Sequence, residues 1–302
     1  MSNTFYLKAQ DGHKIFVRCW PVMEPKAFVQ IIHGMNEHSE RYDKFARFLN
    51  QEGFYVAATD HRGHGRSATN PEKIGYIEEN GFEKMVNDEK LLFSHLQSQF
   101  FNTPHFILGH SMGSFIAQRY IQKYAHEING SILIGSGGKR PELEIGAAIA
   151  GIFERYTDDK RIKNLEKLIF AGYNRRFNKQ TGFEWLANDT EVVDSYLKDP
   201  FCAHVFPPSF YRQFLNFLNM IFQDENVSKV PTSLPIYILS GANDPVGQFG
   251  KGVKRLYEQY EQRGSKDLQY KLYPDGRHEI LNDFDKLLVY QDILAWINNH
   301  LD

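Results

Sequence analysis

Gly109-His110-Ser111-Met112-Gly113 is the stretch of this 302-residue chain that decides its fold. It follows the apolar run His105-Phe-Ile-Leu108 and precedes the helix-like segment from Ser114 to Ile121. This order predicts a strand, a sharp turn with the serine at its apex, and a helix whose first amides face any oxyanion formed there. The glycines fit because a Cβ would clash where the turn brings backbone close to backbone. The same residues also suit a plain Gly/Ser loop, but the flanking patterns favour the strained turn.

The composition is that of a globular protein with a large core. Apolar residues make up 42% of the chain, and the net charge is −2 with acids and bases interspersed, which argues against a nucleic-acid partner. The two cysteines, Cys19 and Cys202, lie far apart and predict neither a disulfide framework nor a metal-ligand pair. The first residues lack a basic region followed by an apolar one, and no apolar run approaches ~18 residues. We therefore expect no signal peptide, no transmembrane helix and a cytoplasmic location.

Short apolar runs alternate with segments of helical spacing along most of the chain, which predicts βαβ units and a mostly parallel sheet with helices on both faces. The first three strands are predicted to form a meander over Thr4–Lys8, Lys14–Trp20 and Ala27–Ile32. Further strands are expected at Phe54–Thr59, His105–Leu108, Ser131–Ile134, Pro235–Leu239 and Leu268–Tyr273, and helices at Tyr42–Gln51, Gly81–Phe100 and Leu287–Asn299.

Residues 138–229 break this alternation. The segment has no obvious strand and is rich in aromatic residues, and an unstructured loop of this length inside a compact domain is not expected. We therefore predict a helical cap at 138–229 inserted into an α/β core made of residues 1–137 and 230–302. Its position in the chain places it over the carboxyl ends of the strands, where such sheets bind ligands. Most of its aromatic residues are expected to form its own core, and the rest to line an apolar pocket.

A seryl hydroxyl needs a base and an acid that orients the base. His278 lies in a polar loop directly after the last predicted strand, and Asp244 follows the buried run that ends at Leu239. Both side chains should therefore emerge at the same sheet edge as Ser111. Asp275 and Asp283 are competing acids, but they flank the histidine-bearing loop and do not end a strand of their own.

An oxyanion hole needs two N–H donors. The first is expected from Met112, the residue after the nucleophile, and the second from Met35 in the loop that follows the third strand. Gly34 allows this loop to turn inward, and His33 is expected to brace it through hydrogen bonds.

The segment Asp60-His-Arg-Gly-His-Gly-Arg-Ser67 is dense in charge and glycine. Its two histidines, His61 and His64, raise the alternative of a metal site, but no cysteine or carboxylate cluster accompanies them. We favour a loop that supports the elbow from beside, and we expect neither a metal nor a cofactor.

Four motifs in this order resemble the monoacylglycerol lipase/lysophospholipase group of α/β-hydrolases, also labelled serine aminopeptidase S33 or hydrolase 4. They are His33-Gly-Met-Asn-Glu-His-Ser-Glu-Arg-Tyr42, Asp60–Ser67, Gly109–Gly113 and Gly276-Arg-His-Glu-Ile-Leu-Asn282. The resemblance implies an α/β-hydrolase fold with Ser111, Asp244 and His278 as the triad and Met35 and Met112 as oxyanion donors.

The resemblance also implies that Glu37 and Arg41 brace the oxyanion loop near the alcohol end of the substrate. The alternative is a surface ion pair between residues four apart. Inside the insertion, Trp185-Leu-Ala-Asn-Asp and Asp199-Pro-Phe-Cys-Ala are similar to bacterial members of the group.

The function expected from these motifs is hydrolysis of a carboxylic ester in a small lipid-like substrate, through an acyl-enzyme on Ser111. Monoacylglycerol is the first candidate and lysophospholipid the second, with transient contact between the cap and a membrane surface. A short-chain carboxylesterase or an aminopeptidase on the same fold is the alternative. A third, remote alternative is a ligand-binding relative that has lost turnover, because a fold alone does not fix function.

Overall fold

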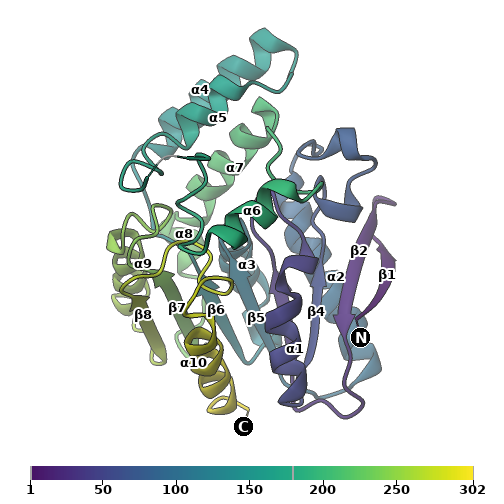
Figure 1. The fold of residues 1–302 in the computed structure, drawn as a ribbon. Helices are drawn as coiled ribbons and strands as arrows, with labels where there is room; N and C mark the ends of the chain where they lie inside the picture. The colour runs from purple at the N-terminus through teal and green to yellow at the C-terminus, as the bar shows by residue number, and fades with distance from the viewer. Residues whose placement is uncertain (1, 179, 302) are drawn as a thin grey trace.

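The computed structural model describes residues 2–178 and 180–301 and is built on one eight-stranded sheet (Figure 1). The strand order is β1-β2-β4-β3-β5-β6-β7-β8, with β1 and β2 antiparallel to their neighbours and the other pairs parallel. The strands are β1 (Asn3–Lys8), β2 (Lys14–Trp20), β3 (Phe28–Ile32), β4 (Tyr55–Thr59), β5 (His105–His110), β6 (Gly130–Ile134), β7 (Ile236–Gly241) and β8 (Leu268–Tyr273).

The predicted three-strand meander is wrong in its third strand. β2 pairs with β4, in the register Val17 opposite Thr59, and β3 lies between β4 and β5. All five residues of β3 are buried, so this strand needs a neighbour on each side and a helical layer on each face. Only the interior of the sheet meets that need, and the chain reaches β4 from β3 by a helical crossover.

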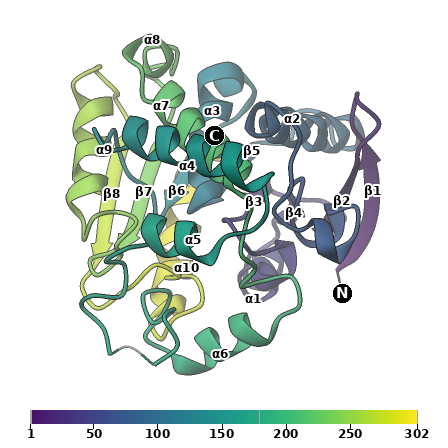
Figure 2. The same cartoon turned by 90° about the horizontal axis from the view of Figure 1, so that it is seen from above.

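Helices cover both faces of the sheet, as predicted. On one face lie α1 (Asp43–Gln51) and α10 (Lys286–Asn298). On the other lie α2 (Gly81–Gln99), α3 (Met112–Tyr124) and α9 (Lys251–Glu261), and the two views agree on this arrangement (Figures 1 and 2). Short 3-10 helices occur at η1 (Ser39–Tyr42), η2 (Gly65–Ser67), η3 (Pro71–Lys73) and η4 (Ala125–Glu127).

The chain between β6 and β7 is helical. It forms α4 (Leu143–Thr157), α5 (Lys163–Ile169), α6 (Thr190–Lys198), α7 (Pro208–Ile221) and α8 (Asp224–Val227). In Figure 1, α4 and α5 lie at the top, beyond the carboxyl ends of the parallel strands, and α4 packs along α7. Among the described residues, no helix combines the length and the apolar character needed to cross a bilayer.

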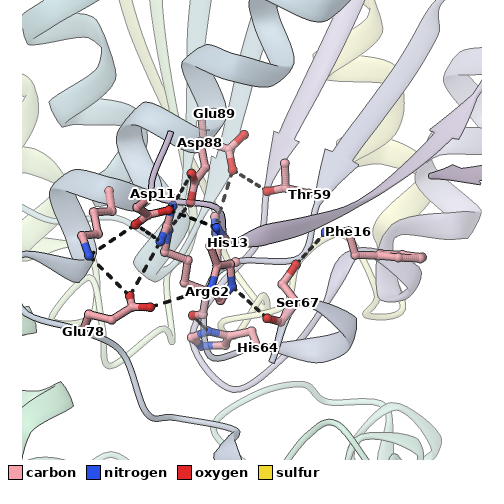
Figure 3. A network of polar contacts seen from close by, with 12 residues as sticks. Asp11, His13, Phe16, Thr59, Arg62, His64, Ser67, Glu78, Asp88 and Glu89 are labelled. Carbon is pink, nitrogen blue, oxygen red and sulfur yellow. Dashed lines mark hydrogen bonds and ion pairs between the residues drawn. The ribbon is translucent and has the colours of Figure 1, made fainter. Parts of the chain in front are cut away.

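Buried polar groups fasten the loop after β4 to α2 (Figure 3). Arg62 donates to both carboxylate oxygens of Asp88, at 2.6 and 2.9 Å. The next residue of α2, Glu89, accepts a 2.6 Å hydrogen bond from Thr59 Oγ1 and another of 2.6 Å from Gln30 Nε2. The Glu89 side chain is completely buried, and this burial raises its pKa to about 7.

The shifted pKa of Glu89 predicts a pH-dependent loss of stability. The unfolded chain releases this proton near pH ~4.3, whereas the folded chain keeps it until about pH 7. The free energy of unfolding should therefore fall as the pH rises across this window, by about 4 kcal/mol, and stay level above it. We expect Glu89→Gln to remove this fall, since an amide keeps hydrogen-bonding capacity without ionising.

Urea unfolding at pH 5 and pH 8 measures most of this fall in the free energy of unfolding, in the wild type and in the variant. An unchanged difference between the two pH values in Glu89→Gln would show that another group causes it.

Candidate active site

The sharp turn between a strand and a helix forms at Ser111, where the sequence predicts it. Ser111 has φ 53° and ψ −122°, a strained conformation for a residue other than glycine, and it occupies the N-cap position of α3 without a capping hydrogen bond from its side chain. A Cβ on Gly109 would lie 2.4 Å from the Gly113 carbonyl oxygen, and a Cβ on Gly113 would lie 2.0 Å from that of Ile32. Both positions therefore require glycine. The Ser111 amide donates to the Ile134 carbonyl at 2.9 Å, which holds the turn against β6.

Asp244 and His278 meet at the same sheet edge. Asp244 Oδ2 lies 3.0 Å from His278 Nδ1, and the carboxylate also accepts from the Val246 amide at 2.8 Å and from Ser240 Oγ at 3.1 Å. Burial by itself would raise the pKa of Asp244, but the charge and hydrogen bond of His278 outweigh it and lower this pKa. The anionic carboxylate favours the tautomer with the proton on Nδ1, which leaves Nε2 free to accept one.

Gly135 supports this pair, and sequence reasoning missed it. It follows β6 directly with φ +59°, and a Cβ there would lie 2.9 Å from His278 Cε1 and 3.4 Å from Asp244 Oδ2. The signal in the sequence is a glycine at the carboxyl end of a buried strand, where backbone has to approach a side chain closely.

Neither of the two competing acids has a hydrogen bond to the His278 ring among the described residues. Asp275 is exposed. Asp283 accepts hydrogen bonds from the backbone amides of Asn188 at 2.9 Å and Asp189 at 3.0 Å, so it holds the segment between β6 and β7 against the core. Within the described part of the chain, Asp244 is the carboxylate bonded to the His278 ring.

The loop after β3 lies directly against the elbow. A Cβ on Gly34 would lie 3.0 Å from Ser111 Cβ, so glycine allows the close approach. Met35, Met112 and Ser111 line the same cavity. The Met112 amide opens α3 and so has no acceptor within its own helix, and the helix dipole adds positive potential there.

Histidines brace the loop after β3 from behind. His33 Nδ1 lies 2.8 Å from the Gly34 carbonyl oxygen, and His33 Nε2 accepts from the His61 amide at 3.0 Å. His61 Nε2 lies 3.1 Å from the His33 carbonyl oxygen. Burial lowers the pKa of His61 to about 3 and that of His64 to about 4, so both rings are neutral at pH 7. The segment 60–67 thus supports the loop that precedes Met35.

Glu37 and Arg41 form a buried network instead of the surface ion pair that was the alternative. Glu37 Oε1 accepts from the Gly34 amide at 2.6 Å and from the Tyr42 hydroxyl at 2.7 Å. Arg41 donates to Glu37 Oε2 at 2.9 Å and binds both oxygens of Glu279, at 2.7 and 2.6 Å. Only 10% of the Arg41 side chain and 4% of the Glu37 side chain are exposed. The network fixes the backbone on which the Met35 amide depends.

His110 joins this network to the loop that carries His278. The sequence did not predict this role for His110, nor the role of Glu279 in the network. His110 Nδ1 lies 3.1 Å from Glu37 Oε1, and His110 Nε2 lies 3.2 Å from the His278 carbonyl oxygen. Burial would lower the pKa of His110, but Glu37 outweighs it and raises this pKa. Two acceptors face the ring, which fits the doubly protonated form. The one signal in the sequence for His110 and Glu279 is that they adjoin Ser111 and His278.

A cavity of about 920 Å³ opens onto these groups, near the upper end of the roughly 300–1,000 Å³ typical of small-molecule sites. Ser111, His278 and Met35 line it together with Glu37 and Arg41. The segment between β6 and β7 contributes apolar side chains to the same cavity, among them Leu143, Ile149, Leu165, Ile169, Phe170, Trp185, Tyr211, Phe214, Leu215 and Leu218.

The sequence and the fold of this chain are similar to those of known proteins. Residues 23–285 match the model of the Hydrolase_4 family, described as serine aminopeptidase, S33. The monoacylglycerol lipase of Mycolicibacterium smegmatis is 27% identical over 96% of this chain and 95% of its own length. Human monoglyceride lipase is 27% identical over 97% of this chain and 89% of its own length. A thermostable carboxyl esterase from Bacillus coagulans, solved with glycerol, superposes with a TM-score of 0.91 at 31% identity over 100% of this chain and 99% of its own.

Proposed function

Since the chain belongs to the serine aminopeptidase S33 family of α/β-hydrolases, we propose that it hydrolyses carboxylic esters of lipid-like substrates, monoacylglycerol first and lysophospholipid second. The observation that carries this proposal is a strained serine and a buried Asp–His pair that open onto one large cavity with apolar walls. The relatives named as monoacylglycerol lipases support the choice of substrate.

The proposed reaction proceeds through an acyl-enzyme. Ser111 Oγ attacks the ester carbonyl while His278 Nε2 takes its proton, and Asp244 stabilises the resulting imidazolium. The amides of Met35 and Met112 donate to the oxyanion. His278 then gives its proton to the departing alcohol, such as glycerol. A water molecule, deprotonated by His278, then attacks the acyl-enzyme, and His278 returns that proton to Ser111 Oγ as the fatty acid leaves.

We assign binding of the acyl chain to the cap, residues 138–229, set over the core of residues 1–137 and 230–302. The apolar side chains that this segment adds to the cavity wall support the assignment. Polar groups in the same wall, Glu37 and Arg41 among them, suit the alcohol end of the substrate.

The experiment that tests the choice of substrate is a series of p-nitrophenyl esters from acetyl to palmitoyl. Each CH₂ buried in the cavity adds up to ~0.8 kcal/mol of binding, or up to about fourfold in kcat/KM. We expect kcat/KM to rise with acyl length until the cavity is full and to drop beyond. A steady fall from acetyl to decanoyl would refute the lipid assignment and favour a short-chain carboxylesterase. Faster cleavage of aminoacyl amides than of any ester in a parallel assay would favour an aminopeptidase.

We also propose transient contact between the cap and a lipid surface. The outer face of α4 exposes large apolar side chains: 66% of Ile145, 58% of Ile152 and 79% of Tyr156 are accessible. In Figure 1, α4 lies at the top of the molecule, far from the sheet. The cytoplasmic location expected from the sequence stays a prediction.

Co-sedimentation with phosphatidylcholine vesicles tests this contact. The wild type should bind, and the double variant Ile145→Ser/Ile152→Ser should bind several-fold less with unchanged activity on a short, dissolved ester. Equal sedimentation of the two proteins would place the membrane contact elsewhere or exclude it.

A further inference from the structure

Three side chains with metal-ligating atoms meet where the cap contacts the core, outside the proposed catalytic groups. His38 precedes η1 in the core, and Asp199 and Cys202 lie in the turn after α6. One ligating atom from each of the three lies within 4.8 Å of the others, and His38 Nε2 is 2.9 Å from Asp199 Oδ2. We propose that these residues bind a thiophilic divalent cation such as Zn²⁺ and that the bound ion clasps the cap to the core.

The donor set fits Zn²⁺ in ligand type and in sequence spacing. Imidazole nitrogen, carboxylate oxygen and thiolate sulfur are the three ligand classes of protein zinc sites. Asp199 and Cys202 are separated by two residues, as paired zinc ligands commonly are, and the Cys202 amide donates to the Asp199 carbonyl at 3.1 Å to close the turn. Mg²⁺ and Ca²⁺ prefer all-oxygen sites, so this set selects against them.

The charges of the ligands favour binding of Zn²⁺ at this buried position. The His38 and Cys202 side chains are buried, whereas 24% of the Asp199 side chain is exposed, which leaves a route for the ion and for a water as fourth ligand. When the ion binds, it displaces the proton that lies between His38 Nε2 and Asp199. This proton moves to His38 Nδ1 or to solvent, and the thiol proton of Cys202 is also released to solvent. Carboxylate and thiolate then balance the two positive charges of Zn²⁺, which a buried site requires.

At this location the ion would hold the cap turn against the core loop that carries Met35. Asn36, next to Met35, exchanges two hydrogen bonds with His204 of the same cap turn, at 2.7 and 2.9 Å. His38 already contacts Asp199 of this turn at 2.9 Å, and the metal would replace that single hydrogen bond by coordinate bonds to His38, Asp199 and Cys202. Because the ion contacts both cap and core, it binds only while they are joined, and mass action then stabilises the folded, closed protein.

Metal binding to the full-length protein, first freed of metal by a chelator, tests the proposal. Calorimetric titration with Zn²⁺ should give one ion per chain, and Zn²⁺ but not Mg²⁺ should raise the melting temperature. Co²⁺ should give a thiolate-to-cobalt charge-transfer band. Cys202→Ser should lose the band and the rise in melting temperature, while Cys19→Ser, which alters the other buried cysteine, should keep both.

A second variant keeps the test decisive if Cys202→Ser is unstable. Asp199→Asn retains a hydrogen-bond acceptor for His38 but removes the carboxylate charge, and it should weaken Zn²⁺ binding at least tenfold. The proposal fails if the wild type binds no Zn²⁺ at micromolar concentrations. It also fails if Cys202→Ser keeps the cobalt band, or if Cys19→Ser loses it. Esterase activity of the metal-free protein is expected throughout, because no metal takes part in the proposed reaction.

Discussion

Replacing Ser111 with alanine is expected to lower kcat by at least ~10³-fold while leaving the fold intact. The acyl-enzyme cannot form without the hydroxyl, and members of a triad act as a unit, so the loss should be nearly complete. Packing should change little, because the substitution removes one oxygen that faces the cavity and leaves the glycines of the turn in place. Steady-state kinetics on a p-nitrophenyl ester, with thermal melting as the check on folding, measures both effects.

A matched control is Ser114→Ala, three residues along the same helix. Ser114 Oγ donates to the Ser111 carbonyl at 2.6 Å, so this variant tests general damage to the elbow. We expect Ser114→Ala to keep far more activity than Ser111→Ala. Retention of more than about a tenth of wild-type kcat by Ser111→Ala would show that another residue is the nucleophile.

Replacing Asp244 with asparagine should lower kcat by roughly 10³–10⁴-fold. The amide keeps the size of the side chain but cannot stabilise the imidazolium, and an amide N–H facing Nδ1 selects the wrong tautomer of His278. Since the Asp244 carboxylate also accepts from Val246 and Ser240, some loss of stability should accompany the kinetic effect. Kinetics measured well below the melting temperature separate the two.

Asp275→Asn and Asp283→Asn are the matched controls, since both aspartates flank the same histidine loop. Asp275→Asn should be nearly silent, because its side chain is exposed. Asp283→Asn should act through stability, because Asp283 holds the backbone of residues 188 and 189. Greater kinetic damage from either control than from Asp244→Asn would assign the acid to another position.

Features of the fold that depend on local patterns could be predicted from the sequence. The buried runs and the glycines around Ser111 predicted the strands, the elbow and the sheet edge shared by Asp244 and His278. Strand pairing depends on long-range packing, and here the prediction failed. The run Ala27–Ile32 has no local feature that distinguishes the end of a meander from the middle of a parallel sheet. Its burial on both faces decides this, and burial emerges only when the helices are in place.

The supporting network was the less predictable part of the site. Arg41 bridges Glu37, four residues away, and Glu279, 238 residues away, and only the first spacing is visible as a sequence pattern. His110 occupies the variable position of its motif, yet the structure sets it between Glu37 and the His278 loop. The contact of Asp199 and Cys202 with His38 could not be predicted from the sequence either, because a contact between cap and core leaves no local pattern.

Hydrolysis of a monoacylglycerol by the purified protein tests the central claim most directly. Wild type and Ser111→Ala would each be incubated with 1-lauroylglycerol, with release of lauric acid and glycerol followed by mass spectrometry. We predict that the wild type releases equimolar lauric acid and glycerol and carries a lauroyl ester on Ser111 in rapidly quenched samples. The variant should release neither product and carry no lauroyl ester. Failure of the wild type to release lauric acid, or equal release by Ser111→Ala, would contradict the proposed function.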